Sequence, residues 1–300
     1  MFLSESDVAR LLTVSELVPV MERALAQFST GNAVQPVRVV VQVAEHHGFM
    51  GVMPAYTGAL GAKLVTFFPN NQNVPTHHAT IVLFRPDTGE PLVTMGGQLI
   101  TEMRTAAVSA VATHLLARAD AKVLGILGSG VQARSHLHAL RTVRNFRLVR
   151  VWSPSHANAF ADRFGVRAAT SAEEAVRGAD VVVVATTSRA PVLFGEWLSP
   201  GAHVNAVGAV RPDWRELDDE TLRRARLFVD SREAAFRESG DVIAAGQACA
   251  EIGEVVAGLR PGRTSAEEIT VFKSVGLGIE DVAAADLVYR KAIADAHIVR

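Results

Sequence analysis

The strongest constraint on the fold is a regular alternation of short β-branched runs and helical runs between residues 119 and about 272. The runs KVLGIL, LVRVW, DVVVVAT, AHVNAVG and RLFVD are typical of buried strands, and VQARSHLHALRTV, HANAFADRF and SAEEAVRG of helices. Such alternation predicts parallel βαβ units, and therefore a Rossmann-type doubly wound α/β sheet. Sheets of this kind bind ligands at the carboxyl ends of their strands, here expected to face the rest of the chain.

The first third of the chain has a different pattern. Helices are expected near the start and at 15–29, and a long one at about 97–117. Between them lie short strand-like runs at 36–43, 48–56, 61–68, 79–84 and 91–96, separated by Gly, Pro, Asn and Asp. This spacing predicts an antiparallel sheet. A last helix is expected at about 277–297, packed back on this part.

The chain is therefore predicted to have two domains. Residues 1–118 plus 273–300 would form an α+β domain completed by the C-terminal helix. Residues 119–272 would form the Rossmann-type domain.

Composition narrows the class of partner. The 300 residues are 49% hydrophobic with a formal net charge of −1, and no run of five Lys or Arg occurs. This argues against nucleic acid or an anionic membrane as the main partner and favours a small molecule. Cys249 is the only cysteine, no apolar run reaches about 18 residues, and the N-terminus does not resemble a secretory signal. A soluble, cytoplasmic protein is expected.

The sequence GILGSGVQAR, residues 125–134, follows the first strand of the alternating part. Gly128 would make the tight turn, Gly130 would let the backbone approach a pyrophosphate, and Ala133 would allow close packing of helix on strand. The free N–H groups at the helix N-terminus favour phosphate. In this context the pattern G-x-G-x-x-A predicts a dinucleotide site, with Ser129, Val131 and Gln132 also in contact; the alternative is a Gly-rich turn without a ligand.

The end of the next strand indicates which dinucleotide is used. An acidic residue there would bind both ribose hydroxyls and repel a 2′-phosphate. Here the chain has Ser153, Pro154, Ser155 and His156. We expect Ser153, Ser155 and His156 to contact the cofactor, with NADPH preferred and NADH possible. The same residues also suit a simple turn and helix cap, and the two interpretations are compatible.

Three cations are flanked by apolar residues. Arg104 is the only charge on a helical face formed by Ile100, Val108, Val111 and Leu115. A buried guanidinium needs an anion, either a substrate carboxylate or a carboxylate of the protein, and the pattern leaves both open. Lys63 shares a strand face with Val65 and Phe67, so it either reaches to the rim or handles a carboxylate or a proton. Arg38 shares a face with Val40 and Gln42. If the three converge, they form an anion pocket.

Two histidines, His77 and His78, precede a predicted strand, and one of them could donate a proton. Adjacent histidines in a loop are more often at the surface. Their spacing does not suit a metal, and no Cys/His/carboxylate cluster suggests zinc, so no metal site is expected.

Longer segments resemble the ornithine cyclodeaminase/mu-crystallin family, in particular its ketimine reductase branch. They include QPVRVVV, GFMGVMPAY, RTAAVSAVAT, LGSGVQARSH, NAVGAVRPDWRELDD and VFKSVGLGIEDVAAADLVY, and the resemblance covers nearly the whole chain. It implies a homodimer whose first domain supplies the dimer interface and much of the substrate pocket. It also implies that Arg38, Lys63 and Arg104 occupy carboxylate-binding positions. Ser274, Val275 and Gly276 lie where the family's chain passes the nicotinamide, and Thr186 and Val207 are further expected cofactor contacts.

One departure from the family pattern bears on the reaction. Cyclodeaminases carry a catalytic Asp after GG or GA in this region, whereas GAVRPDW places Val210 there, lining the substrate pocket. Asp213, three residues later, is not expected to replace it. Release of ammonia from ornithine is therefore disfavoured.

The expected activity is that of an NAD(P)H-dependent imine oxidoreductase acting on CH–NH bonds. It would reduce Δ1-pyrroline-2-carboxylate to L-proline, as in proline metabolism, and Δ1-piperideine-2-carboxylate to L-pipecolate. Arg104, Arg38 and Lys63 would hold the carboxylate, and solvent, His77 or Lys63 would protonate the imine nitrogen. Alternatives are an ornithine cyclodeaminase or alanine-type dehydrogenase of the same family, and an NADPH-dependent, crystallin-like binding protein with little turnover. A pure binder would not need a carboxylate fork.

Overall fold

The computed structural model describes residues 1–247 and 249–295, and the chain divides into two compact units. The split unit consists of Met1–Arg104 and Gly276–Arg300, and the central unit of Thr105–Val275. The sequence places these boundaries at 118 and 272. The first boundary falls instead inside a helix, α3 (Gln98–Leu116), directly after Arg104.

The split unit is built on a six-stranded sheet in the order β1-β6-β5-β4-β3-β2. Neighbouring strands from β2 to β6 are antiparallel, as predicted, and β1 joins β6 in parallel. Its elements are β1 (Phe2–Leu3), α1 (Glu5–Leu11), α2 (Val14–Ser29), β2 (Val39–Val43), η1 (Ala44–His46), β3 (Gly48–Tyr56), β4 (Leu60–Phe67), β5 (His77–Phe84), β6 (Pro91–Gly96) and α11 (Gly278–Ala294).

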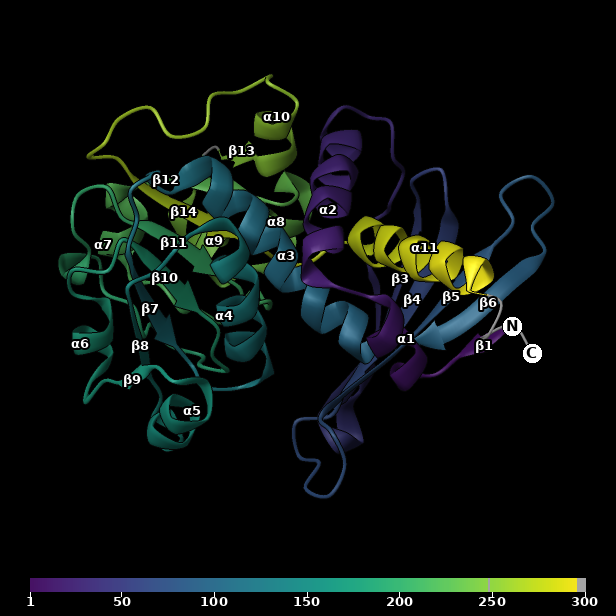
Figure 1. Ribbon diagram of the computed structural model, residues 1–300, viewed down its shortest axis with the longest axis horizontal. Coiled ribbons are helices and arrows are strands. Elements are labelled where there is room, and N and C mark those ends of the chain that lie inside the picture. The colour runs from purple at the N-terminus through teal and green to yellow at the C-terminus, as the bar shows by residue number, and fades with distance from the viewer. Residues whose placement is uncertain (248, 296–300) are drawn as a thin grey trace. The chain divides into compact units, whose positions relative to one another are not determined.

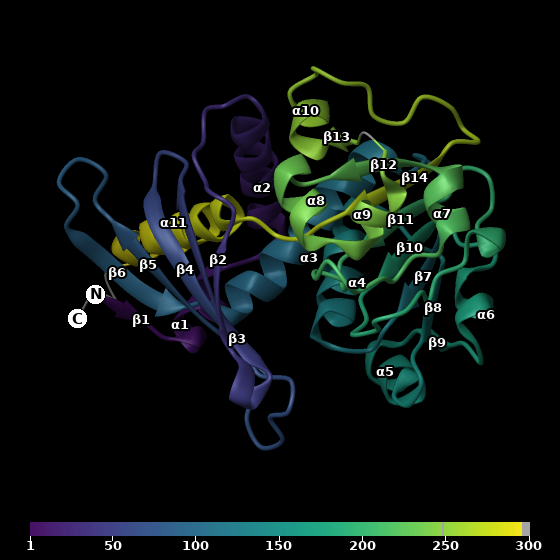
Figure 2. The same ribbon diagram turned by 180° about the vertical axis from the view of Figure 1, so that it is seen from behind.

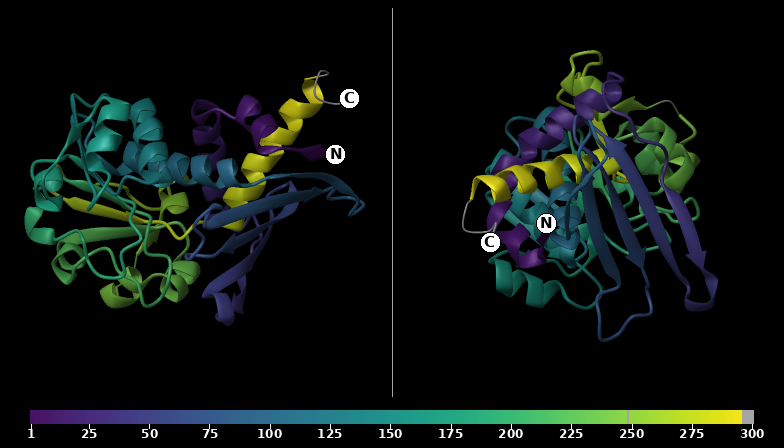
Figure 3. Two further views of the ribbon diagram at one scale, coloured as in Figure 1. Left: turned by 90° about the horizontal axis from the view of Figure 1, so that it is seen from below. Right: turned by 90° about the vertical axis from the view of Figure 1, so that its right-hand side faces the viewer.

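Helix α11 lies across one face of this sheet and contacts β3, β4, β5 and α2 (Figure 1). Figure 2, seen from behind, has the strands of the unit in front of α11, and the right-hand view of Figure 3 shows how the helix crosses them. The expected packing of the last helix on the first domain is thus observed. The helix ends at Ala294, and the last two positions predicted for it, 296 and 297, lie outside the described residues.

The strand register decides which side chains face α11. Lys63 is paired with Met53 on β3 and with Ile81 on β5, and the side chains of all three are buried. Because side chains alternate along a strand, Val39 and Val41 of the edge strand β2 point to the opposite face, with Met50 and Val52. Lys63 therefore stands on the covered face of the sheet.

The central unit contains an eight-stranded, wholly parallel sheet in the order β13-β12-β14-β11-β10-β7-β8-β9. The order reverses between β7 and β10, which is the switch point of a doubly wound sheet. The strands are β7 (Val123–Leu127), β8 (Leu148–Trp152), β9 (Arg167–Ala168), β10 (Val181–Val184), β11 (His203–Ala206), β12 (Ala225–Val229), β13 (Ala250–Glu251) and β14 (Ile269–Lys273). The predicted fold class is confirmed.

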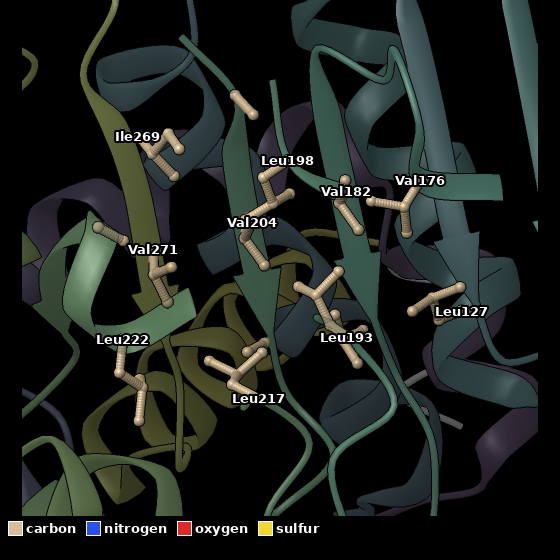
Figure 4. Close-up of a cluster of buried hydrophobic side chains, with 14 of the residues drawn as sticks. Leu127, Val176, Val182, Leu193, Leu198, Val204, Leu217, Leu222, Ile269 and Val271 are labelled. Atoms are coloured by element: carbon tan, nitrogen blue, oxygen red, sulfur yellow. The ribbon is translucent and has the colours of Figure 1, made fainter. Parts of the chain in front are cut away.

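The helices of this unit are α4 (Val131–Val143), α5 (Ala157–Phe164), α6 (Ala172–Val176), η2 (Gly195–Trp197), α7 (Asp219–Arg224), α8 (Arg232–Glu238), α9 (Gly240–Ala245) and α10 (Ile252–Val256). A core of aliphatic side chains lies against the sheet (Figure 4). It includes Val182, Val204 and Val271 from three neighbouring strands, all fully buried. This packing holds the carboxyl ends of the strands in fixed register. No helix in the described part of the chain is long and apolar enough to cross a membrane.

Candidate active site in two parts

The glycine loop lies at the carboxyl end of β7, beside the switch point. Gly128 has φ +114°, and a Cβ built there would lie 2.3 Å from the Ala185 carbonyl oxygen. Only glycine fits both the backbone conformation and this close approach. The loop is therefore locked against the chain segment that follows β10.

Gly130 has a different role in the same loop. It is the N-cap of α4, and no atom lies within 4 Å of the position that a Cβ would take. Ala133, one turn later, is fully buried, whereas Val131 is 55% exposed. An open backbone before a helix N-terminus fits a pyrophosphate, because the first N–H groups of the helix have no partner within it. The local structure thus suits the dinucleotide interpretation of the motif.

The segment at the end of β8 is joined to this loop. Ser129 Oγ donates to Ser153 Oγ at 2.9 Å, and Ser153 Oγ accepts a hydrogen bond from the His156 N–H at 3.1 Å. Ser155 Oγ lies 3.1 Å from His156 Nδ1. The segment thus forms the predicted turn before α5, and His156 is the N-cap residue without a side-chain cap hydrogen bond. The segment also presents exposed hydroxyl and imidazole groups, without a carboxylate, beside the glycine loop.

Further along the same edge, buried carboxylates hold the expected cofactor contacts. Asp230 Oδ2 accepts from Ser274 Oγ at 3.0 Å and from the Val275 N–H at 2.8 Å. Glu216 Oε1 accepts from the N–H and the hydroxyl of Thr186 at 2.8 and 2.7 Å. Val207 directly follows β11 and precedes Gly208 and Ala209, whose N–H groups donate to Glu216 Oε2. Asp230 and Glu216 were not among the predicted site residues.

In the split unit, the side chain of Lys63 is 2% exposed and its Nζ lies 2.6 Å from Asp281 Oδ2 in α11. The expectation that Lys63 reaches to the rim is therefore wrong. Lys63 is buried on the covered face of the sheet, and Asp281 supplies the opposite charge that burial requires.

Arg104 is bound by the same helix. Its Nε donates to Asp281 Oδ1 at 3.0 Å and its Nη1 to Glu280 Oε2 at 2.5 Å, with all three side chains buried. Of the two alternatives left open by the sequence, the protein carboxylate is present. Asp281 bridges Lys63 and Arg104, so it fixes the two cations relative to each other.

Arg38 completes the group. It lies just before β2, and its Nη2 donates to the Gly276 carbonyl at 2.7 Å. Gly276 has φ +79°, and a Cβ there would lie 2.6 Å from Arg104 Nη1. A glycine is therefore required where the chain passes the two arginines. The three predicted cations do converge.

We call this group of side chains the cation cluster. It consists of Arg38, Lys63 and Arg104 with the carboxylates Glu280 and Asp281. Three converging cations, two of them with a planar guanidinium group, are suited to binding a carboxylate.

Burial shifts the proton equilibria in the cluster. Burial lowers the pKa of Lys63 to about 8, although Asp281 raises it, and Arg104 and Arg38 lower it further. Burial opposes the charge of Arg104 as well, but Asp281 and Glu280 outweigh it and raise the pKa of the guanidinium. Lys63 is thus mostly protonated at pH 7 and can release its proton at little cost.

His77 differs from its predicted place. It is the first residue of β5 instead of lying before a strand, and it is half-buried, whereas His78 is exposed. Burial, then Lys63 and Arg104, lower the pKa of His77 to about 4. Its ring is therefore neutral at pH 7 and poorly suited to donate a proton.

Val210 lies in the loop after β11 and is 38% exposed. Asp213 is exposed in the same loop. In the described residues this loop therefore presents an apolar side chain at position 210, where a cyclodeaminase would carry its carboxylate.

Glu280 and Asp281 were missed because of where they lie in the sequence. Acidic residues in the first turn of a helix are expected from the helix dipole alone. The available signal was that both stand in the otherwise apolar segment GLGIEDVAAADLV, at positions that a buried helix would normally fill with apolar residues.

Comparison with known proteins decides the family. A model of the ornithine cyclodeaminase/mu-crystallin family matches residues 1–296. The chain belongs to this family. Among its curated members, the ketimine reductase mu-crystallin of Mus musculus is 52% identical, over 96% of each chain. The resemblance inferred from the motifs is confirmed.

Solved structures of the family share the whole fold. The Δ1-pyrroline-2-carboxylate reductase of Thermococcus litoralis, in complex with NADH and L-proline, has a TM-score of 0.93 and 43% identity over 98% of each chain. An archaeal alanine dehydrogenase dimer with bound NAD has a TM-score of 0.92 and 37% identity, covering 98% of this chain and 96% of its own. The relatives thus include oxidoreductases that bind nicotinamide dinucleotides.

Proposed function

We propose that this protein is an NAD(P)H-dependent reductase of cyclic ketimine carboxylates, converting Δ1-pyrroline-2-carboxylate to L-proline and Δ1-piperideine-2-carboxylate to L-pipecolate. The observation that carries the proposal is the cation cluster, in which Arg38 joins the buried pair Lys63 and Arg104 and the lysine is protonated at pH 7. The 52% identity to a ketimine reductase and the likeness to a reductase in complex with NADH and L-proline support it.

The substrate carboxylate would bind to Arg104 and Arg38. Glu280 and Asp281 occupy Nη1 and Nε of Arg104, so we assign the substrate to Nη2. The two carboxylates prevent rotation of the guanidinium, and a fixed donor orients a planar carboxylate better than a mobile one. The imine carbon next to that carboxylate is then held in one orientation.

Lys63 is the proposed proton donor. The dinucleotide, when bound, supplies the hydride for the imine carbon, and the nitrogen must carry a proton for the C=N bond to become CH–NH. A pKa of about 8 keeps Lys63 protonated at pH 7 yet acidic enough to give up the proton, whereas the pKa of His77 is too low. Asp281, 2.6 Å away, stabilises the ammonium until it does.

The glycine loop would hold the pyrophosphate through Gly128, Gly130 and the start of α4. NADPH is the preferred cofactor in this proposal, because Ser153, Ser155 and His156 offer donors to a 2′-phosphate and no carboxylate repels it. NADH remains usable, since no Arg side chain lies within 153–156.

The rival functions receive less support. Val210 removes the carboxylate that ammonia release from ornithine would use, which disfavours a cyclodeaminase. A crystallin-like binding protein would need no buried lysine poised to lose a proton. An alanine-type dehydrogenase shares the carboxylate requirement but acts on a linear substrate.

We further propose a homodimer joined through the open face and edge of the split unit's sheet. Val39 and Val41 in the edge strand β2 are 60% and 55% exposed, and they share their face with Met50 and Val52. An apolar edge strand exposed in this way favours pairing with another chain. Val41→Lys is expected to give monomers in light scattering, and an unchanged oligomer would contradict this interface.

The function is tested by a substrate screen with NADPH and NADH. Both cyclic imines should be reduced, and L-alanine and L-ornithine should be poor substrates in the oxidative direction with NAD⁺ or NADP⁺. Release of ammonia from ornithine, without imine reduction, would overturn the proposal.

A further inference from the structure

A second buried ionic group lies in the central unit, at the carboxyl ends of β10, β11 and β14. It consists of Glu216, Asp241 and Lys273, whose side chains are almost wholly excluded from solvent. None of them is in the cation cluster.

Glu216 holds two loops with one carboxylate. Oε1 accepts from the N–H and hydroxyl of Thr186, at 2.8 and 2.7 Å, in the loop after β10. Oε2 accepts from the N–H groups of Gly208 and Ala209, at 2.7 and 3.0 Å, in the loop after β11. Four donors bind this one buried carboxylate and hold the two loops together. Hydrogen bonds to a charged group are stronger than hydrogen bonds between neutral groups.

Asp241 and Lys273 fix the position of Glu216. Asp241 Oδ1 accepts from the backbone N–H groups of Glu216 and Leu217, both at 3.1 Å. Lys273 Nζ lies 3.3 Å from Asp241 Oδ2 and 3.9 Å from Glu216 Oε2, balancing part of the negative charge. Gly208 is required here, since a Cβ would lie 2.3 Å from Glu216 Oε1.

The two loops that Glu216 joins lie close to the expected dinucleotide site. The glycine loop follows β7, the strand next to β10, and Gly128 packs against Ala185 at the start of the first loop. In a doubly wound sheet, a dinucleotide lies along this edge, with one nucleotide on each side of the switch point. The adenosine ribose is expected to bind at the end of β8. The loops after β10 and β11 lie on the other side of β7 from β8.

We propose that Glu216 is a positioning residue for the nicotinamide half of the dinucleotide. It acts through the loops 185–188 and 207–209 and does not touch the cofactor itself. This inference rests on the proposed function, because it presumes a nicotinamide cofactor.

The test separates the two halves of the cofactor. Binding of NADPH and of 2′-phospho-ADP-ribose, which lacks the nicotinamide, is measured by calorimetry. Glu216→Gln keeps the shape but replaces an acceptor with a donor that faces N–H groups. It should weaken NADPH binding tenfold or more and change binding of the fragment less than twofold. Since a loose nicotinamide is poorly placed for hydride transfer, kcat should fall together with the rise in KM for NADPH.

Asp180 provides the matched control. Its Oδ2 also accepts from two backbone N–H groups, those of Lys122 and Val123 at 2.7 and 2.9 Å, but it precedes β10 and so lies at the opposite edge of the sheet. Asp180→Asn should lower Tm and change binding of neither ligand more than twofold. If Glu216→Gln weakens both ligands equally, or neither, the positioning role is overturned.

Two other results have a defined meaning: a Glu216→Gln variant that does not fold, and a wild-type protein that binds neither ligand. If Glu216→Gln does not fold, Thr186→Val removes one of the four donors and should weaken NADPH about threefold without affecting the fragment; equal or no effect overturns the inference. Wild-type protein that binds neither ligand overturns the proposed function and this inference with it. Normal wild-type binding with equal losses in the variant contradicts only the role of Glu216.

Discussion

Lys63 Nζ and Asp281 Oδ2 lie 2.6 Å apart, although Lys63 is the fourth residue of strand β4 and Asp281 lies in the first turn of the last helix, α11. The contact joins segments more than 200 residues apart in the chain. It places a carboxylate beside a lysine whose ammonium form is disfavoured by burial. The carboxylate lies in the first turn of the helix, where the positive end of the helix dipole stabilises a negative charge. The chemistry proposed for this protein depends on it.

The pH dependence of the reaction should report Lys63. Because the pKa of Lys63 is about 8, kcat/KM for the imine is expected to fall as pH rises through about 8, where the donor loses its proton. Lys63→Arg keeps the charge but does not titrate there. It should lower kcat about 10²–10⁴-fold, the usual cost of losing a general acid, and abolish that decline. A decline that persists near pH 8 in Lys63→Arg would assign it to another group.

Removing the charge of Asp281 should move the same profile. Asp281 raises the pKa of Lys63, so Asp281→Asn is expected to shift the decline to lower pH. It also breaks a buried ion pair, at a cost of about 3–5 kcal/mol in the free energy of unfolding. The control is Asp286→Asn on the same helix: its partner Arg290 is 72% exposed, so the cost should stay below about 1 kcal/mol. Equal losses in urea titrations of the two variants would contradict the buried pair.

Arg104 should anchor the substrate carboxylate. Arg104→Ala is expected to raise KM for the imine and to lower kcat/KM by two or more orders of magnitude, at about 1.4 kcal/mol per tenfold. Arg104→Lys keeps the charge but loses the fork, so it should recover only part of the activity. NADPH binding, measured by calorimetry, should not change. A normal kcat/KM in Arg104→Ala would exclude Arg104 as the anchor.

Cofactor preference should depend on the segment after β8. Ser155→Asp places a carboxylate where none is present, which should repel a 2′-phosphate and raise KM for NADPH more than KM for NADH. The ratio of the two kcat/KM values gives the measurement. If the wild-type protein prefers NADH, or if the ratio is unchanged in the variant, the segment after β8 does not recognise the ribose.

Stability in acid should be limited by two buried histidines of the central unit. Burial lowers the pKa of His203 to about 3 and of His136 to about 4. The unfolded chain takes up these protons near pH 6.5, so the stabilisation is complete above that value and is lost as pH falls toward the folded pKa values. Each histidine should cost about 1.4 kcal/mol per pH unit in that window.

The measurement is the midpoint of urea unfolding between pH 7 and 5. His203→Gln should flatten the dependence, whereas substitution of the exposed His114 should leave it unchanged. A pH dependence that is the same in the wild-type protein and in both variants would rule out His203 as its cause.

Much of the fold could be predicted because it is encoded locally. Alternation along the strands and the spacing of the helices are properties of neighbouring residues, and nearly every predicted strand is present. The short strands β1, β9 and β13 were not predicted, since two residues carry no periodicity. β14 was missed because ITVFK runs directly into FKSVG, a segment interpreted as a cofactor contact.

The site was predictable only in part, for the same reason. Lys63 and Arg104 stand out as charges on apolar faces, so they could be found without their partners. Glu280, Asp281 and Glu216 are recognisable only once distant segments are brought together, because an acid at a helix start or in a polar loop is ordinary in sequence. Convergence is a tertiary property, and spacing along the chain does not contain it.

The most direct test of the central claim is the rate of NADPH oxidation by purified protein with Δ1-pyrroline-2-carboxylate, followed at the nicotinamide absorbance band with the product identified as L-proline. We expect saturable oxidation that yields one L-proline per NADPH consumed and that Arg104→Ala reduces at least a hundredfold. No oxidation above background, with ammonia released from ornithine in the presence of NAD⁺, would contradict the account.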